Sequence, residues 1–189
     1  NITMNKHFVF LMIGMFTLAL SVPAQENAGL TLPSGFKANL FAQNLGSPRH
    51  IAVTSKGVLF AKLNNPNKEG KSILRLEDTN GDGVADKNTG WGNYPGTGIY
   101  VKGNKLYTSS NEDVYAYQLD ANDEVMNPLQ PITVVSGLIN RRQHESKSIT
   151  FDNDNNLYVN IGAYSNACQV KDRMPCLLYT SDAADDTPC

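Results

Sequence analysis

A polar loop that contains one histidine is the first candidate for chemistry in this sequence. The segment 141–149 carries Arg141, Arg142, His144 and Lys147 immediately before an apolar run. A histidine exchanges protons near neutral pH, so it suits the role of a general base. The three cations would attract an anionic ligand. On residue types alone, a solvated histidine is the commoner alternative, and Lys147 suits a solvated charge as well as a ligand contact.

The acidic segment 78–86 is the second candidate, because its oxygen-bearing residues are spaced as in calcium-binding loops. Side-chain oxygens at positions 1, 3 and 5 precede Gly83 at position 6, which matches the first half of such a loop. Position 12 is Thr89 instead of a bidentate glutamate, so a plain turn between strands stays an open alternative. A calcium ion here would be structural, and its predicted ligands are Asp78, Asn80, Asp82, Val84 and Asp86.

The composition excludes several other classes of function. The chain has 189 residues, of which 41% are hydrophobic and 18% charged, with a formal net charge of −2. These values favour a folded protein over a disordered one. Because there is no basic excess, we do not expect nucleic acid as a partner. The sequence shows no zinc-type spacing of Cys and His, no phosphate-binding loop and no Ser/His/Asp arrangement.

Three similar hairpins surround these candidates, and the polar loop precedes the last of them. Each hairpin has a short apolar strand, a turn rich in Gly, Asn or Asp, and a second strand with a leucine beside an aromatic residue. These marker leucines, Leu59, Leu106 and Leu157, lie 47 and 51 residues apart. Further short apolar runs bring the repeat to about four strands in about 50 residues, which is typical of propeller blades.

We therefore expect an all-β fold, an incomplete β-propeller of about three blades. An immunoglobulin-like sandwich is the alternative, because it would explain the strands but not the repeated hairpin. In a propeller, the loop before an innermost strand opens onto the central channel. This placement would bring His144 to a ligand-binding position.

Both ends of the chain are expected to lie outside this domain. Residues 4–24 resemble a secretory signal peptide, because a basic start precedes the apolar run 8–22, which is too short for a comfortable membrane span. We expect a periplasmic or secreted protein without a stable membrane anchor, and a partial propeller domain over 25–175. Residues 176–189 resemble the translation of a sequencing adapter, so we expect an artefact there and a fragment of a longer chain.

The segment that begins at His144 resembles the quinoprotein glucose/sorbosone dehydrogenase family. The matching pieces are His144-x-Ser146-x-x-Ile149 and Asp154-x-x-Leu157-Tyr158-Val159-x-Ile161-Gly162. Two further runs, Ser165-Asn166-Ala167-Cys168-Gln169 and Leu32-Pro33-Ser34-Gly35-Phe36, resemble the sorbosone dehydrogenase branch. Two positions depart from the glucose-oxidising branch: Gln143 stands where Asp is common, and no Gln occurs near Gly96-Thr97-Gly98.

The resemblance implies a six-bladed propeller that holds pyrroloquinoline quinone (PQQ) and calcium and oxidises a sugar or sugar aldehyde. His144 would remove the hydroxyl proton of the substrate, a hydride would pass to the quinone, and calcium would polarise the quinone oxygen. Arg141, Arg142 and Lys147 are the candidate cofactor contacts. Electrons would leave to an exported acceptor such as a cytochrome. The fragment alone is expected to be inactive, because the remaining cofactor and calcium ligands belong to later blades.

Two other functions stay open. One is a non-catalytic propeller that binds a glycan or an exported protein partner. The other is a calcium-dependent lactonase-type propeller, which needs convergent acidic ligands that the sequence does not show.

Overall fold

The computed structural model describes residues 26–140 and 144–162. The predicted signal peptide at 4–24 and the predicted artefact at 176–189 lie outside these residues, as do Arg141 and Arg142. The chain divides into two compact units, the first ending at Ala38. The described part of the first unit holds a short 3-10 helix, η1 (Glu26–Gly29). Among the described residues, no helix is long and apolar enough to cross a membrane.

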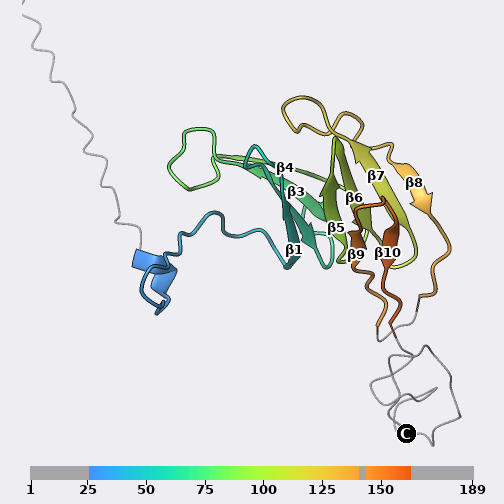
Figure 1. Cartoon of the computed structure of the whole chain (residues 1–189), viewed down its shortest axis with the longest axis horizontal. Coiled ribbons are helices and arrows are strands. Elements are labelled where there is room, and N and C mark those ends of the chain that lie inside the picture. Colours follow the sequence, from blue (N-terminus) through green and yellow to red (C-terminus); the bar gives the residue numbers. More distant parts are fainter. Residues whose placement is uncertain (1–25, 141–143, 163–189) are drawn as a thin grey trace, which may run out of the picture. The chain divides into compact units, whose positions relative to one another are not determined.

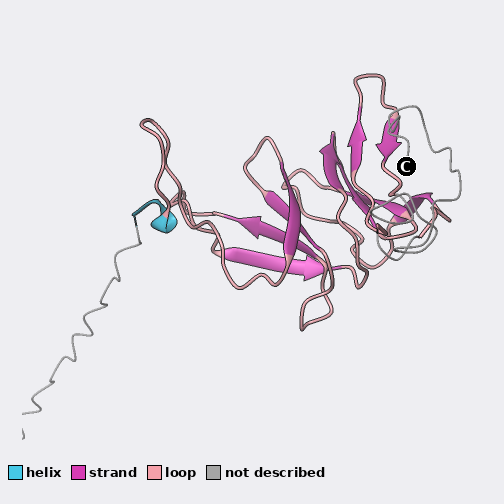
Figure 2. Ribbon diagram, turned by 90° about the horizontal axis from the view of Figure 1, so that it is seen from below, coloured by secondary structure: helices cyan, strands magenta, loops and turns pink. Residues whose placement is uncertain are grey.

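The second unit consists of short antiparallel strands that follow one another in chain order (Figures 1 and 2). The first sheet contains β1 (Pro48–Val53), β2 (Leu59–Leu63), β3 (Ile73–Glu77) and β4 (Lys87–Trp91). The second contains β5 (Ile99–Lys102), β6 (Lys105–Ser109), β7 (Val114–Gln118) and β8 (Ile132–Val135). The third contains β9 (Ile149–Phe151) and β10 (Leu157–Val159). The all-β prediction is confirmed, whereas the number of blades and the incompleteness of the propeller stay predictions.

The three predicted hairpins form, and their strands pair in the same register. In each hairpin the marker leucine faces the last apolar residue of the preceding strand. The facing pairs are Val53–Leu59, Val101–Leu106 and Phe151–Leu157. Positions counted from these pairs are therefore equivalent in the three sheets. We call β1, β5 and β9 the first strands; β5 contacts both β1 and β9.

Trp91 is the centre of the core that joins the first and second sheets. Its ring meets the ring of Phe60 edge-on at a centroid distance of 6.3 Å, and that of Tyr117 at 5.7 Å. Edge-on aromatic pairs add about 0.5–1.5 kcal/mol to the stabilisation from buried area. Both sheets supply the buried residues of this core, which are Val58, Phe60, Ile73, Trp91, Ile99, Leu106, Tyr117 and Leu119.

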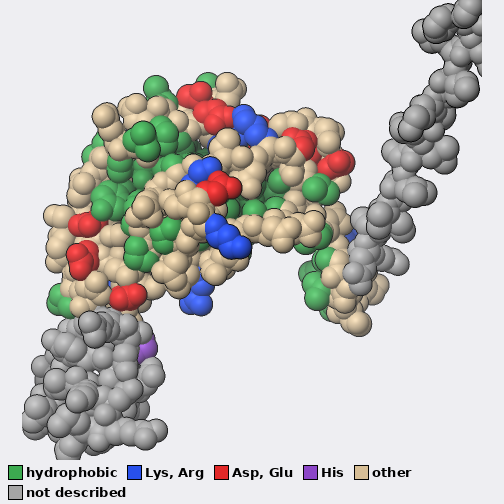
Figure 3. Space-filling view, turned by 180° about the vertical axis from the view of Figure 1, so that it is seen from behind, with side chains coloured by type: hydrophobic (Ala, Val, Ile, Leu, Met, Phe, Trp, Pro, Cys, Tyr) green, Lys and Arg blue, Asp and Glu red, His purple; other side chains and the backbone are tan. Residues whose placement is uncertain are grey.

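Arg75 on β3 is fully buried and ties the first sheet to the turn that follows β7. Its guanidinium donates to Glu77 Oε2 at 2.7 Å and to the carbonyl oxygens of Asn122 and Asp123 at 3.0 and 2.9 Å. Glu124 lies 3.4 Å from the same group. On the face shown in Figure 3, acidic and basic side chains likewise lie interspersed.

Lys62 at the end of β2 is a second buried cation between the sheets. Its amino group donates to Ser72 Oγ at 3.1 Å and to the carbonyl oxygens of Leu63 and Tyr94 at 3.2 and 3.0 Å. It also lies 4.7 Å from the centroid of the Tyr94 ring. Neutral oxygens satisfy the amino group without balancing its charge, and burial lowers the pKa of Lys62 to about 7.

Replacing Arg75 by alanine should lower the free energy of unfolding by about 3 kcal/mol, because the fully buried side chain and its hydrogen bonds to Glu77, Asn122 and Asp123 are lost. The exposed pair Lys71–Glu69 provides the control. There, Lys71→Ala should change the free energy of unfolding by less than about 1 kcal/mol. Urea denaturation of both variants measures the difference, and equal effects would contradict the role given to Arg75.

The free energy of unfolding should contain a rise with pH that comes from Lys62. Unfolded Lys62 holds its proton up to a pKa of 10.5, whereas folded Lys62 releases it near pH 7. Between these values the unfolded chain binds more protons, so rising pH favours folding by about 1 kcal/mol per pH unit. The variant Lys62→Met should lack this rise from pH 7 to pH 9. We would measure the free energy of unfolding of both proteins with denaturant. An equal change with pH in the two proteins would contradict the lowered pKa of Lys62.

Candidate functional site

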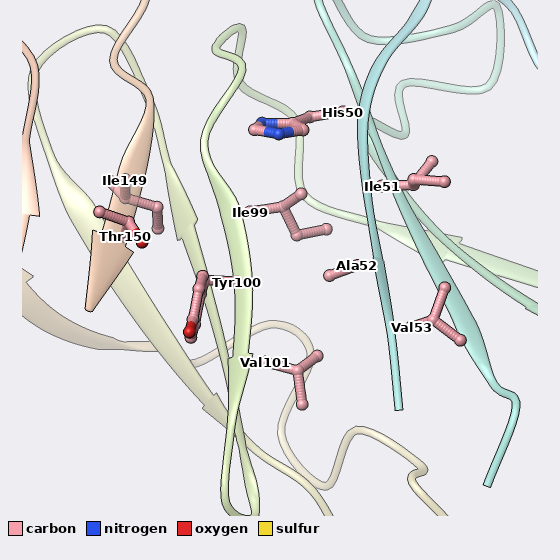
Figure 4. A pocket seen from close by; sticks show the side chains of 9 residues that line it. All are labelled: His50, Ile51, Ala52, Val53, Ile99, Tyr100, Val101, Ile149 and Thr150. Carbon is pink, nitrogen blue, oxygen red and sulfur yellow. The ribbon is translucent and has the colours of Figure 1, made fainter. Parts of the chain in front are cut away.

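The three first strands line one open cavity of about 500 Å³ (Figure 4). Hydrophobic residues make up most of its wall, and two of them, Ile51 and Val53, are more than half exposed. A concave surface that combines apolar side chains with a few polar groups is the usual form of a small-molecule site. The lining residues are His50, Ile51, Ala52, Val53, Ile99, Tyr100, Val101, Ile149 and Thr150.

His144 stands five residues before Ile149, at the approach to β9. Its side chain is half-buried, and its backbone is held against the segment that follows β10. A methyl group on Gly162 would lie 2.3 Å from His144 Cβ and 2.4 Å from the His144 carbonyl oxygen. Only glycine permits this approach, so Gly162 and His144 lie back to back. The structure thus brings together the two ends of the motif that begins at His144.

Lys147 is fully buried, which makes the solvated-charge interpretation wrong. Its amino group donates to the carbonyl oxygen of Glu145 at 2.5 Å, and its own carbonyl oxygen accepts a hydrogen bond from Ser109 Oγ at 2.5 Å. These contacts order the approach to β9. Arg141 and Arg142 lie outside the described residues, so their predicted cofactor contacts stay predictions, as does that of Lys147.

His50 is a candidate that the sequence analysis did not identify. It is exposed and lines the cavity at the start of β1 (Figure 4). Two further polar groups, the hydroxyls of Tyr100 and Thr150, belong to lining residues on β5 and β9. The sequence repeat could have pointed to these two hydroxyls, because Tyr100 and Thr150 occupy the same register position in two equivalent strands.

The acidic segment lies between β3 and β4, away from the first strands. Its side chains accept hydrogen bonds within their own loop, and the N–H groups of Gly83 and Gly81 lower the pKa of the Asp78 carboxyl. Within the described ranges, no three His, Cys, Asp or Glu residues cluster to hold a metal ion. The acceptor–donor pairs are Asp78–Gly81, Asp78–Gly83, Asn80–Asp82, Asp82–Val84 and Asp86–Thr79. These hydrogen bonds stabilise the loop as a turn, and the calcium site stays a prediction.

If this loop binds calcium, millimolar Ca²⁺ should raise the melting temperature of the protein, and Asp82→Asn should reduce that gain. The asparagine keeps an oxygen that accepts from the N–H of Val84 and removes one ligand charge, so it separates ion binding from turn formation. Thermal unfolding with Ca²⁺ and with a chelator measures both proteins. An equal gain in the wild type and the variant would assign any calcium effect to another site.

Comparison with known proteins gives the fold a context. The calcium structure of a Trichoderma reesei carbohydrate-active enzyme of family AA12 has a TM-score of 0.60 and 24% identity; 79% of this chain and 37% of that chain are covered. The holo PQQ domain of pyranose dehydrogenase from Coprinopsis cinerea has a TM-score of 0.54 and 20% identity, with 66% and 30% covered. This chain therefore spans about a third of these structures. No curated protein matches it.

At these identities the likeness shows a shared fold. The family follows from the sequence itself, because a family model described as TrAA12-like matches residues 30–173. This match includes all three hairpins, the cavity-lining strands and the loop with His144. The chain belongs to the TrAA12-like family.

Proposed function

We propose that this chain is part of an exported, PQQ-dependent dehydrogenase that oxidises a sugar or sugar aldehyde. The observation that carries the proposal is the position of His144, half-buried at the approach to a first strand and fixed by Gly162. Membership of the TrAA12-like family and a fold shared with a PQQ domain support it. The sequence resemblance further supports the sorbosone branch, a six-bladed propeller, and an exported acceptor such as a cytochrome.

The described cavity suits the flat ring of a quinone better than it suits the negatively charged carboxylates of the cofactor. Its volume and the apolar side chains among its lining residues suit a flat ring, and His50, Tyr100 and Thr150 supply polar groups. No Lys or Arg is among the lining residues that the structure describes. We therefore propose that Arg141, Arg142 and residues of further blades contact the cofactor's three carboxylates, with Lys147 as a further candidate whose amino group in this structure bonds the carbonyl of Glu145.

His144 acts in this proposal as the general base that takes the hydroxyl proton of the substrate. Bound PQQ supplies the electron acceptor for the hydride, and bound Ca²⁺ supplies a Lewis acid. The protein's part is orientation: Gly162 fixes one end of the loop against the backbone of His144, and Ser109 fixes the other end through the carbonyl of Lys147.

The variant His144→Gln should lower the turnover number by about 10²-fold or more, because the base is lost. It should still fold, since Gly162 contacts the Cβ and backbone of residue 144, which glutamine keeps. We would measure dye reduction with aldoses and aldehydes in the protein that contains this chain, loaded with PQQ and Ca²⁺. Glu69→Gln, a change at an exposed carboxylate, is the control.

Binding of PQQ, followed by its absorbance, should be retained in His144→Gln. Normal turnover by this variant would remove His144 from the mechanism. Failure of the wild-type protein to bind PQQ would instead favour the non-catalytic alternative, a propeller that binds a glycan or an exported protein.

A further inference from the structure

Three polar residues occupy the same register position in the three sheets. Lys62, Ser109 and Asn160 each follow the marker leucine of their hairpin by three residues. This position lies at the end of the second strand, beside the start of the first strand in the same hairpin. The repeated polar character predicts a shared task at this end of the sheets.

All three side chains bond the backbone that leads into a first strand. We call the five residues before Ile99 and before Ile149 the lead-in segments 94–98 and 144–148; His144 begins the second one. Lys62 donates to the carbonyl of Tyr94 at 3.0 Å, at the beginning of the first segment. Asn160 Oδ1 accepts from the N–H of Ser148 at 2.7 Å, at the end of the second.

Ser109 is the member of this group that bonds both lead-in segments at once. Its fully buried hydroxyl accepts from the N–H of Gly98 at 2.9 Å and donates to the carbonyl of Lys147 at 2.5 Å. The two segments press together at this point. A methyl group on Gly98 would lie 2.5 Å from both Ser109 Oγ and the Lys147 carbonyl oxygen. The hydroxyl thus fills the space between two backbones.

We infer that Ser109 is a positioning residue for His144, acting through the carbonyl of Lys147; the inference rests on the proposed role of His144. Among the described contacts, the segment that begins with His144 is held by Gly162 at His144 itself, by Ser109 at Lys147 and by Asn160 at Ser148. Between these points Lys147 Nζ bonds the carbonyl of Glu145 and closes the loop on itself. Loss of the Ser109 hydroxyl removes the described side-chain bond to the carbonyl of Lys147 and leaves the contacts at Gly162 and Asn160.

The test compares two serine-to-alanine changes in neighbouring residues. Ser109→Ala removes the bond to Lys147. Ser110→Ala is the matched control, because Ser110 Oγ accepts from the N–H groups of Glu112 and Asp113 in its own turn. Amide hydrogen exchange of segment 144–149 and the NMR signals of the His144 imidazole are recorded in the protein that contains this chain, without quinone or sugar.

Ser109→Ala should speed exchange in 144–149 by about 5- to 100-fold and change the His144 signals, because a buried carbonyl loses its donor. Ser110→Ala should speed exchange only around residues 110–114. Unchanged exchange of 144–149 in Ser109→Ala, or an equal and uniform increase in both variants, would overturn the inference. If Ser109→Ala does not fold, Ser109→Cys, which has a weaker donor of similar size, is measured with the same two outcomes.

The two proposals fail separately. The exchange measurement involves no PQQ and no turnover, so it supports or overturns the positioning role alone. Normal turnover in His144→Gln, with fast exchange in Ser109→Ala, would keep the anchor and remove the catalytic base.

Discussion

The packing of the first sheet against the second through Trp91 is the contact on which the rest of this structure depends. The strands are three to six residues long, and isolated short hairpins are marginally stable in water. The edge-on contacts of Trp91 with Phe60 and Tyr117 lie in a core to which both sheets contribute buried residues. This packing fixes β1 beside β5 and so forms two walls of the cavity.

Buried polar groups then set how the sheets are placed along one another. Apolar packing is non-directional, whereas the bonds of Arg75 to the carbonyls of Asn122 and Asp123 join particular atoms of the two sheets. Lys62 at the end of β2 bonds the segment before β5, and Ser109 at the end of β6 bonds the segment before β9. Burying Lys62 has a cost that appears as its lowered pKa, and the hydrogen bonds to neutral oxygens offset part of it.

The candidate site depends on both the packing of the sheets and these buried polar contacts. The first strands supply an apolar wall, and the segments that lead into them carry the groups suited to chemistry. In the third sheet that segment begins with His144, whose backbone is fixed by Gly162. The TrAA12-like family model matches residues 30–173, a range that includes both the first strands and this segment.

Sequence patterns alone determined the strands, because alternation and turn residues are local signals. The marker leucines located all three hairpins, and the structure adds that their strands pair in the same register. The exposure of side chains was harder to predict. Lys147 is buried, not solvated, and His50 lines a cavity.

Only the tertiary structure decided these points, because each depends on residues far away in the chain. Ser109 lies 38 residues before the carbonyl it bonds, and neither residue type identifies the other as its partner. The need for glycine at position 162 is likewise visible only in the structure, where the segment after β10 lies against His144. The sequence by itself determined which segments become strands; the packing of sheets determined which polar groups those strands bury, expose or bring together.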